Sequence, residues 1–164
     1  MAQFDDHANQ AERNLQFLEQ INGNVKDCVD WQVTVCFYTA LHLINAHLAN
    51  FGLQYRTHNS VKDALNPERQ TSVSKLPENE YTAYVGLQML SRRSRYLVNE
   101  KDGQTSSQQA ALTNEKHLVK ALRNLDKLLM FFVTSYGRPM PHINVYCDRL
   151  KPQNDLQYMQ VGTK

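Results

Sequence analysis

The feature that most constrains the fold is a long apolar stretch at residues 30–52, DWQVTVCFYTALHLINAHLANFG. As a helix it would be roughly 30 Å long and would place apolar side chains on two opposite stripes. One stripe carries Trp31, Val35, Tyr38, His42, Asn45 and Ala49, and the other carries Val33, Cys36, Ala40, Ile44 and His47. A helix that is apolar on both sides is buried at the centre of a domain, or its second side meets a partner chain. We therefore expect a central helix here.

Three other long segments have the apolar periodicity of helices. They are residues 5–21, which precede the turn sequence NGN, residues 77–99, which begin with proline and acids, and residues 113–136. Residues 59–66 form a shorter candidate helix that ends before a proline. No segment shows the alternation typical of a strand. The expected fold class is therefore all-α, an antiparallel up-and-down four-helix bundle with an additional short helix.

The length of 164 residues fits one domain with a substantial core. Gly52 and Gly137 suit the left-handed position that often follows a helix. Prolines come soon after Gly137, and the helical periodicity is lost beyond them. We therefore expect a helical bundle domain at residues 1–137 and an irregular C-terminal tail at residues 138–164.

The overall charge and the cysteines exclude several classes of protein. The 18 Lys plus Arg and 16 Asp plus Glu give a formal charge of +2, so any basic surface must be local. The three cysteines are unclustered, which gives neither a disulfide framework nor a C-x-x-C site. The N-terminal residues are acidic and polar, unlike a signal peptide, and no apolar run reaches membrane-spanning length. We expect a cytoplasmic protein with no membrane contact.

The sequence also lacks the common motifs of cofactor and metal sites. It has no phosphate-binding glycine loop, no dinucleotide-binding fingerprint, no G-x-S-x-G elbow and no E-x-x-H for a carboxylate-bridged iron pair. His42 and His47 point to different sides of their helix, which argues against a shared metal. We expect no cofactor and no metal, although a site that joins His42 to His58 through the intervening loop stays open.

An aromatic stripe runs into two arginines in the segment 77–99. One face of that helix carries Tyr81, Tyr84, Val85, Gln88, Arg92, Arg95, Tyr96 and Asn99. Buried arginines need partners, because an unpaired charge is costly to bury. Helix-terminal carbonyls and acids of the first helix are one set of partners, and a phosphate bound by the planar guanidinium is the other. Arg92, Arg95 and Tyr96 are therefore candidate ligands of phosphate or nucleic acid.

The segment 113–136 has a clear core stripe and a basic stripe. The basic stripe consists of Lys116, Lys120, Arg123 and Lys127. Such a stripe attracts nucleic acid, but it is also typical of an ordinary solvated face. No aromatic residues are interleaved with it, so base stacking is not indicated there.

The two histidines of the apolar stretch call for separate interpretations. The simplest one for His42 is a half-buried imidazole that bonds to a neighbouring hydroxyl or carbonyl. The alternative is a polar cluster with Tyr38, Asn45 and the segment 77–99, which makes His42 a candidate site residue. His47 is expected to cap or line a contact between helices.

Several short patterns together resemble a known superfamily. They are D-W at 30–31, F-Y-x-A-x-H at 37–42, a histidine soon after that helix, and S-R-x-x-R-Y at 91–96. Over about residues 27–98 the chain resembles bacterial proteins of the HEPN superfamily. The resemblance implies a four- or five-helix up-and-down bundle and frequent homodimerisation. It also implies roles in RNA cleavage, nucleotide binding, or toxin–antitoxin and defence systems.

The chain departs from the catalytic pattern of that superfamily. Its ribonucleases form a metal-independent site from an arginine and a histidine with four to six residues between them, brought together across a dimer interface. No arginine of this chain is followed by a histidine at that spacing. A ribonuclease would instead need His42 or His58 as the base for the RNA 2′-hydroxyl. Arg92 or Arg95 would then stabilise the charge at phosphorus.

Three hypotheses follow from these patterns. The first is a dimeric module that binds RNA or a nucleotide phosphate around Arg92, Arg95, Tyr96, His42 and His58, without catalysis. The second is a metal-independent endoribonuclease with a non-standard Arg/His pair from the same residues. The third is a non-catalytic scaffold, the partner of a nucleotidyltransferase or an antitoxin.

Overall fold

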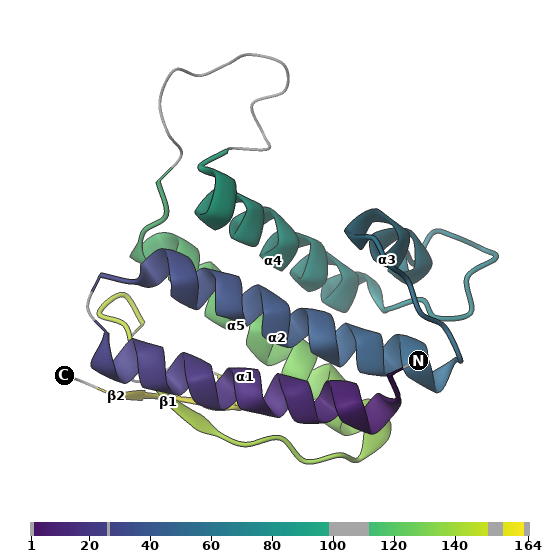
Figure 1. Ribbon diagram of the computed structural model, residues 1–164, viewed down its shortest axis with the longest axis horizontal. Coiled ribbons are helices and arrows are strands. Elements are labelled where there is room, and N and C mark those ends of the chain that lie inside the picture. Colours follow the sequence, from purple (N-terminus) through teal and green to yellow (C-terminus); the bar gives the residue numbers. More distant parts are fainter. Residues whose placement is uncertain (1, 26, 99–111, 151–155, 163–164) are drawn as a thin grey trace.

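The computed structural model describes residues 2–25, 27–98, 112–150 and 156–162. These parts of the chain are mostly helical, with five helices and two short strands (Figure 1). The elements are α1 (Phe4–Asn24), α2 (Val29–Asn50), α3 (His58–Leu65), α4 (Glu78–Tyr96), α5 (Glu115–Tyr136), β1 (Ile143–Tyr146) and β2 (Met159–Gly162). The expectation of a helical fold is confirmed. The expectation that the chain contains no strand was wrong.

Residues in the left-handed backbone region follow three of the long helices. Gly52 follows α2 with a φ of 69°, and Gly137 caps α5 with a φ of 64°, as the sequence predicted. Helix α4 ends at Tyr96, slightly earlier than expected, because Leu97 adopts a φ of 56° there. A non-glycine residue pays a steric cost in this conformation, so sequence alone does not predict that end. Asn99 lies outside the described residues.

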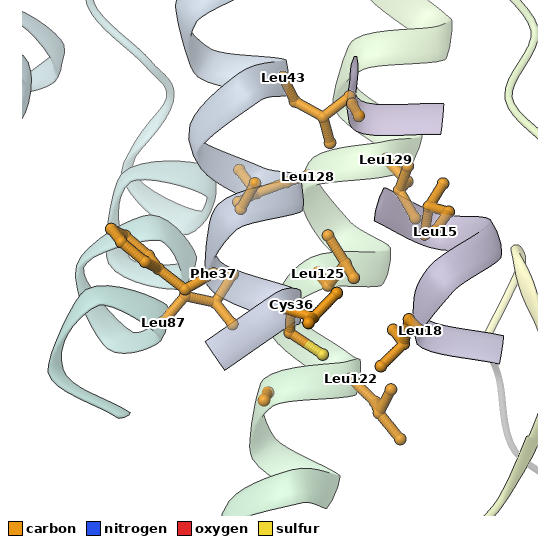
Figure 2. Close-up of a cluster of buried hydrophobic side chains, with 14 of the residues drawn as sticks. Leu15, Leu18, Cys36, Phe37, Leu43, Leu87, Leu122, Leu125, Leu128 and Leu129 are labelled. Carbon is orange, nitrogen blue, oxygen red and sulfur yellow. The ribbon is translucent and has the colours of Figure 1, made fainter. Parts of the chain in front are cut away.

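Helix α2 is the central element of the core, as expected. It packs against α1, α4 and α5. Figure 2 shows Cys36, Phe37 and Leu43 of α2 among leucines of the three surrounding helices. Burial raises the pKa of the Cys36 thiol, so this cysteine packs as an apolar residue. The other stripe of α2 is less covered, and Trp31 is 64% exposed.

Helix α5 separates its two stripes as the sequence predicted. Its core stripe of Leu118, Leu122, Leu125, Leu129 and Phe132 is buried. Its basic stripe of Lys116, Lys120, Arg123 and Lys127 is exposed. None of the described helices has the length and apolar character needed to cross a membrane.

The segment after α5 is more regular than the sequence suggested. Strands β1 and β2 pair in parallel, and β1 lies against α1. The Asn22 side chain of α1 holds β1, because its amide donates to the Tyr146 carbonyl oxygen (3.0 Å) and its Oδ1 accepts from the Tyr146 N–H (2.6 Å). Ile143 and Val145 are buried in the common core. The expected irregular tail is therefore corrected for the described residues of 138–164.

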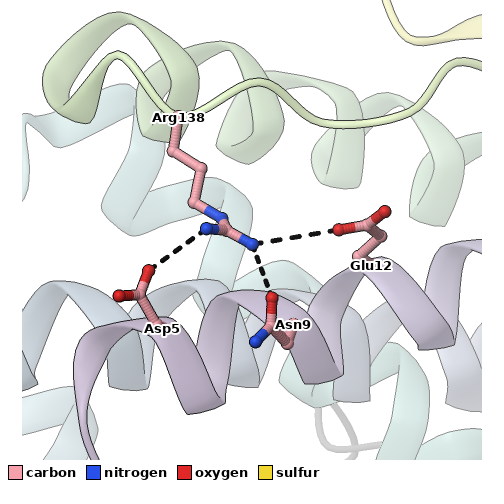
Figure 3. A network of polar contacts seen from close by, with 4 residues as sticks. All are labelled: Asp5, Asn9, Glu12 and Arg138. Atoms are coloured by element: carbon pink, nitrogen blue, oxygen red, sulfur yellow. Dashed lines mark hydrogen bonds and ion pairs between the residues drawn. The ribbon is translucent and has the colours of Figure 1, made fainter.

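A second attachment of this segment to α1 is made by Arg138, directly after α5. Figure 3 shows its guanidinium facing three side chains of α1. Nη1 lies 3.1 Å from Asp5 Oδ1, and Nη2 lies 2.6 Å from Asn9 Oδ1 and 3.9 Å from Glu12 Oε2. The chain that leads from α5 to β1 is thus fixed along α1.

Candidate phosphate-binding site

A surface pocket of about 460 Å³ lies between the start of α3 and the C-terminal half of α4. We call it the α3–α4 pocket. Its lining residues are Thr57, His58, Asn59, Gln88, Arg92, Arg95 and Tyr96. Four of the five predicted site residues, His58, Arg92, Arg95 and Tyr96, therefore lie together in one recess. Helical spacing explains the α4 side, since residues 88, 92, 95 and 96 occupy neighbouring turns on one face.

Arg95 is held between two tyrosine rings. Its guanidinium carbon lies 5.0 Å from the ring centroid of Tyr96 and 5.8 Å from that of Tyr38 on α2. Nε donates to the Ser91 side chain (3.1 Å), and Nη1 donates to the Tyr96 hydroxyl (3.3 Å). Among the described residues, no carboxylate forms an ion pair with Arg95. The charge of Arg95 is therefore stabilised by neutral groups, and it stays available to an anion.

His58 forms the opposite wall of the α3–α4 pocket. Its ring packs edge-on against Phe37, with centroids 5.4 Å apart. Burial, together with the positive charge of Arg95, lowers the pKa of His58. Its imidazole is therefore neutral at pH 7, in the form that accepts a proton or a hydrogen bond.

His42 lies away from this pocket, which differs from the cluster that we expected. Its Nδ1 atom is 3.2 Å from Nδ1 of His7 on α1. Burial lowers the pKa of His42, and the nearby His7 and Arg13 lower it further. Tyr38, one turn earlier on α2, packs on Arg95 of α4. Because α2 packs against both α1 and α4, these two residues of one stripe contact different helices.

His47 has the structural role that the sequence suggested. It is buried, and its two ring nitrogens bond to the Tyr136 hydroxyl of α5 and to the Ser74 carbonyl oxygen (2.9 Å). Burial lowers the pKa of His47, against the opposing effect of the Ser74 carbonyl. His47 therefore links α2 to α5 and to the loop before α4.

The ring of His42 contacts His7, whereas the ring of His58 contacts Phe37. The structure therefore does not bring these two histidines to a common site. Within the described ranges, no group of three or more His, Cys, Asp or Glu side chains is arranged to hold a metal ion. The chemistry of the α3–α4 pocket therefore comes from its own cations, its neutral imidazole and its amides.

Two residues of this site, Thr57 and Asn59, were not singled out from the sequence, and a third, Tyr38, was expected beside His42. Thr57 caps α3 by accepting a hydrogen bond from the Ser60 N–H, which places Asn59 at the pocket. Tyr38 was assigned to a cluster with His42, yet it packs on Arg95. A capping threonine directly before His58 was the available signal for the first two. The contact of Tyr38 with Arg95 joins two helices that are far apart in the sequence. No short sequence pattern therefore predicts it.

Comparison of the chain with protein-family models, curated proteins and solved structures gave no match. The resemblance to the HEPN superfamily therefore rests on the sequence patterns at 30–31, 37–42 and 91–96 and on the histidine that follows the second of them.

Proposed function

We propose that the protein is a HEPN-like module that binds RNA or a nucleotide phosphate in the α3–α4 pocket. The observation that carries this proposal is the setting of Arg95, which is flanked by Tyr38 and Tyr96 and pairs with no described carboxylate. Guanidinium groups bind phosphate oxygens in a bidentate way, and exposed tyrosine rings stack on bases. Arg92 and His58 add a second cation and a hydrogen-bonding imidazole to the same recess.

The fold that we propose for this module is an antiparallel up-and-down four-helix bundle with α3 as an additional helix. The short connection between α1 and α2 supports this topology, because short connections join antiparallel neighbours. The contacts of α2 with α1 and α5, and of α4 with both α2 and α5, support it further.

We further propose that the module works as a homodimer in the cytoplasm, in a toxin–antitoxin or defence setting. Three exposed apolar side chains support a contact with a partner chain. They are Trp31 on α2 and the consecutive Leu97 and Val98 after α4. Light scattering at increasing protein concentration tests this part. A mass that stays that of one chain throughout the concentration series would contradict it.

Binding of a labelled single-stranded RNA tests the main proposal. Arg95→Gln removes one cation from the pocket. It should therefore weaken binding about tenfold and lower the salt dependence by about one phosphate contact. Arg93→Gln is the matched control, because Arg93 bonds to the Leu112 carbonyl oxygen and does not line the pocket.

The pattern across these two variants decides the outcome. A loss with Arg95→Gln and unchanged binding with Arg93→Gln supports the pocket. Equal losses would indicate a diffuse attraction to the basic surface and would contradict it. Absence of binding by the wild-type protein would favour the third hypothesis, a scaffold for a nucleotidyltransferase or an antitoxin.

A second candidate function is that of a metal-independent endoribonuclease. The observation that favours it is the neutral His58 beside Arg95. His58 would take the proton of the RNA 2′-hydroxyl, whose oxygen forms a bond to phosphorus while the bond to the 5′-oxygen breaks. Water would return a proton to that leaving oxygen, and Arg92 or Arg95 would stabilise the charge at phosphorus.

Incubation of RNA with the protein in excess chelator tests this candidate. Cleavage by the wild type and by His42→Gln, but not by folded His58→Gln, would establish it. His42→Gln is the matched control because His42 lies at α1, outside the pocket. Intact RNA in every sample would leave binding without catalysis.

A further inference from the structure

A larger recess lies over the exposed side of α5, on a different face of α4 from the α3–α4 pocket. We call it the α5 hollow, and its volume is about 780 Å³. It is lined by Gly86, Met89 and Leu90 of α4, by Lys120, Arg123, Asn124, Asp126, Lys127 and Met130 of α5, and by Leu156. Nothing in the proposed function uses this surface.

The charge of the α5 hollow is positive. Lys120, Arg123 and Lys127 are all exposed along it. Asp126 is the one carboxylate among the described lining residues, and it is only 3% exposed. Both of its oxygens accept hydrogen bonds from the backbone N–H groups of Gln157 and Tyr158, at 2.8 to 3.1 Å. Asp126 is thus engaged with the segment that leads into β2, and no other carboxylate of the described residues lines the hollow beside the three cations.

Apolar side chains lie beside these cations. Met89 and Leu90 are half-buried on the α4 side, and Leu156 is half-buried directly before Gln157, whose N–H bonds to Asp126. Met130 on α5 is 43% exposed. Flexible methionines are typical of surfaces that adapt to an incoming apolar helix face. The hollow therefore offers apolar contacts and positive charge side by side.

The spacing of the cations indicates the form of the ligand. Lys120, Arg123 and Lys127 are three and four residues apart, so they follow one side of α5 over about 10 Å. A ligand with a single charged head group would engage only one end of that row. Acidic side chains on successive turns of a second helix would match all of it. RNA would match the charge as well, but no aromatic side chain is among the described lining residues for base stacking.

We propose that the α5 hollow is the docking surface for an acidic amphipathic helix of a partner protein. The apolar face of that helix would pack on Met89, Leu90 and Met130. Its carboxylates would face the cations of α5. This site is separate from the α3–α4 pocket, and its occupation is measured independently of RNA binding there.

A designed peptide tests the proposal. The probe is a fluorescent helical peptide of about 20 residues, long enough to be helical alone, with leucines along one face and glutamates on both flanks. Its twin has glutamine in place of every glutamate. Fluorescence anisotropy with the full chain should show binding of the acidic peptide, and binding of the twin should be at least about tenfold weaker.

Variants of the protein then locate the peptide. Arg123→Glu should weaken binding about tenfold or more, because it places like charges together. Met130→Ser should weaken it as well, through the lost apolar contact. Lys116→Glu is the matched control, since Lys116 belongs to the same basic stripe of α5 but does not line the hollow. It should leave binding within about twofold of the wild type.

Three outcomes would overturn the proposal. One is failure of the acidic peptide to bind the wild-type protein. Another is an equal loss with Lys116→Glu and Arg123→Glu, which would indicate a non-specific charge effect. The third is a combined result: Met130→Ser binds the acidic peptide as well as the wild type does, and Arg123→Glu loses binding of single-stranded RNA. That result would make α5 a phosphate-binding face. Circular dichroism of each variant excludes unfolding as the cause of any loss.

Discussion

At the scale of single residues, the surroundings of an arginine decide what it is available to bind. Arg138 faces Asp5, Asn9 and Glu12 and is occupied in holding the chain together. Arg95 instead has two tyrosine rings and a serine around it. These neutral groups hold the guanidinium in place without neutralising its charge. A positioned and uncancelled guanidinium at the surface is what an anion-binding site requires.

His47 is the residue whose loss should cost the most stability among the histidines. His47→Ala would leave the Tyr136 hydroxyl and the Ser74 carbonyl without their partner in a buried contact. We expect the free energy of unfolding to fall by about 2–3 kcal/mol in urea denaturation. His142→Ala, at an exposed position, should change it by less than about 0.5 kcal/mol. Equal effects of the two variants would contradict the structural role of His47.

The histidines also predict how stability depends on pH. Burial lowers the folded-state pKa of His7, His42, His47, His58 and His117 below the usual value of about 6.5. The unfolded chain therefore binds protons first as the pH falls, so stability is complete above about pH 6.5 and declines below it. Urea denaturation at about pH 7.5 and about pH 5.5 measures the loss of stability. His47→Gln should reduce the difference in the free energy of unfolding between the two pH values. Equal or higher stability at the lower pH would contradict it.

At the scale of elements, the helices follow from the sequence more directly than the strands do. The stripes of α5 repeat over many residues, and the glycines that follow α2 and α5 mark where these helices end. Strand β1 alternates buried and exposed positions, but only over four residues, which is too short for a clear period. Its anchor, Asn22, lies 124 positions away from Tyr146, so no local pattern connects them.

Asn22→Ala tests how β1 is attached to α1. The change leaves the Tyr146 N–H and carbonyl without their side-chain partner. It should cost about 2 kcal/mol and speed hydrogen exchange of the Tyr146 amide. Asn144→Ala serves as the control, because Asn144 bonds to Glu19 at the surface. Unchanged exchange at Tyr146 in Asn22→Ala would contradict this attachment.

At the scale of the whole molecule, a nearly neutral chain carries two separate local concentrations of positive charge. One is the α3–α4 pocket, with its tyrosine rings, and the other is the α5 hollow, with its methionines. The neighbouring side chains distinguish them, because aromatic rings suit bases and flexible apolar side chains suit a helix face. We therefore propose a nucleotide phosphate as the ligand of the first surface and a protein partner as the ligand of the second.

The sequence located one side of the α3–α4 pocket better than the other. Arg92, Arg95 and Tyr96 lie on one helix face, which spacing alone identifies. The histidine was ambiguous, because the choice between His42 and His58 depends on which helix packs against each side of α2. In the folded chain His42 contacts His7 on α1, and His58 lines the α3–α4 pocket.

The most direct test of the central claim is an NMR titration of the histidine rings with and without a nucleoside monophosphate. A phosphate bound beside Arg95 would offset the positive charge that lowers the pKa of His58. The account predicts that the nucleotide raises the titration midpoint of His58 and leaves that of His42 in place. Midpoints that are the same with and without the nucleotide, or an equal rise for both histidines, would contradict phosphate binding in the α3–α4 pocket.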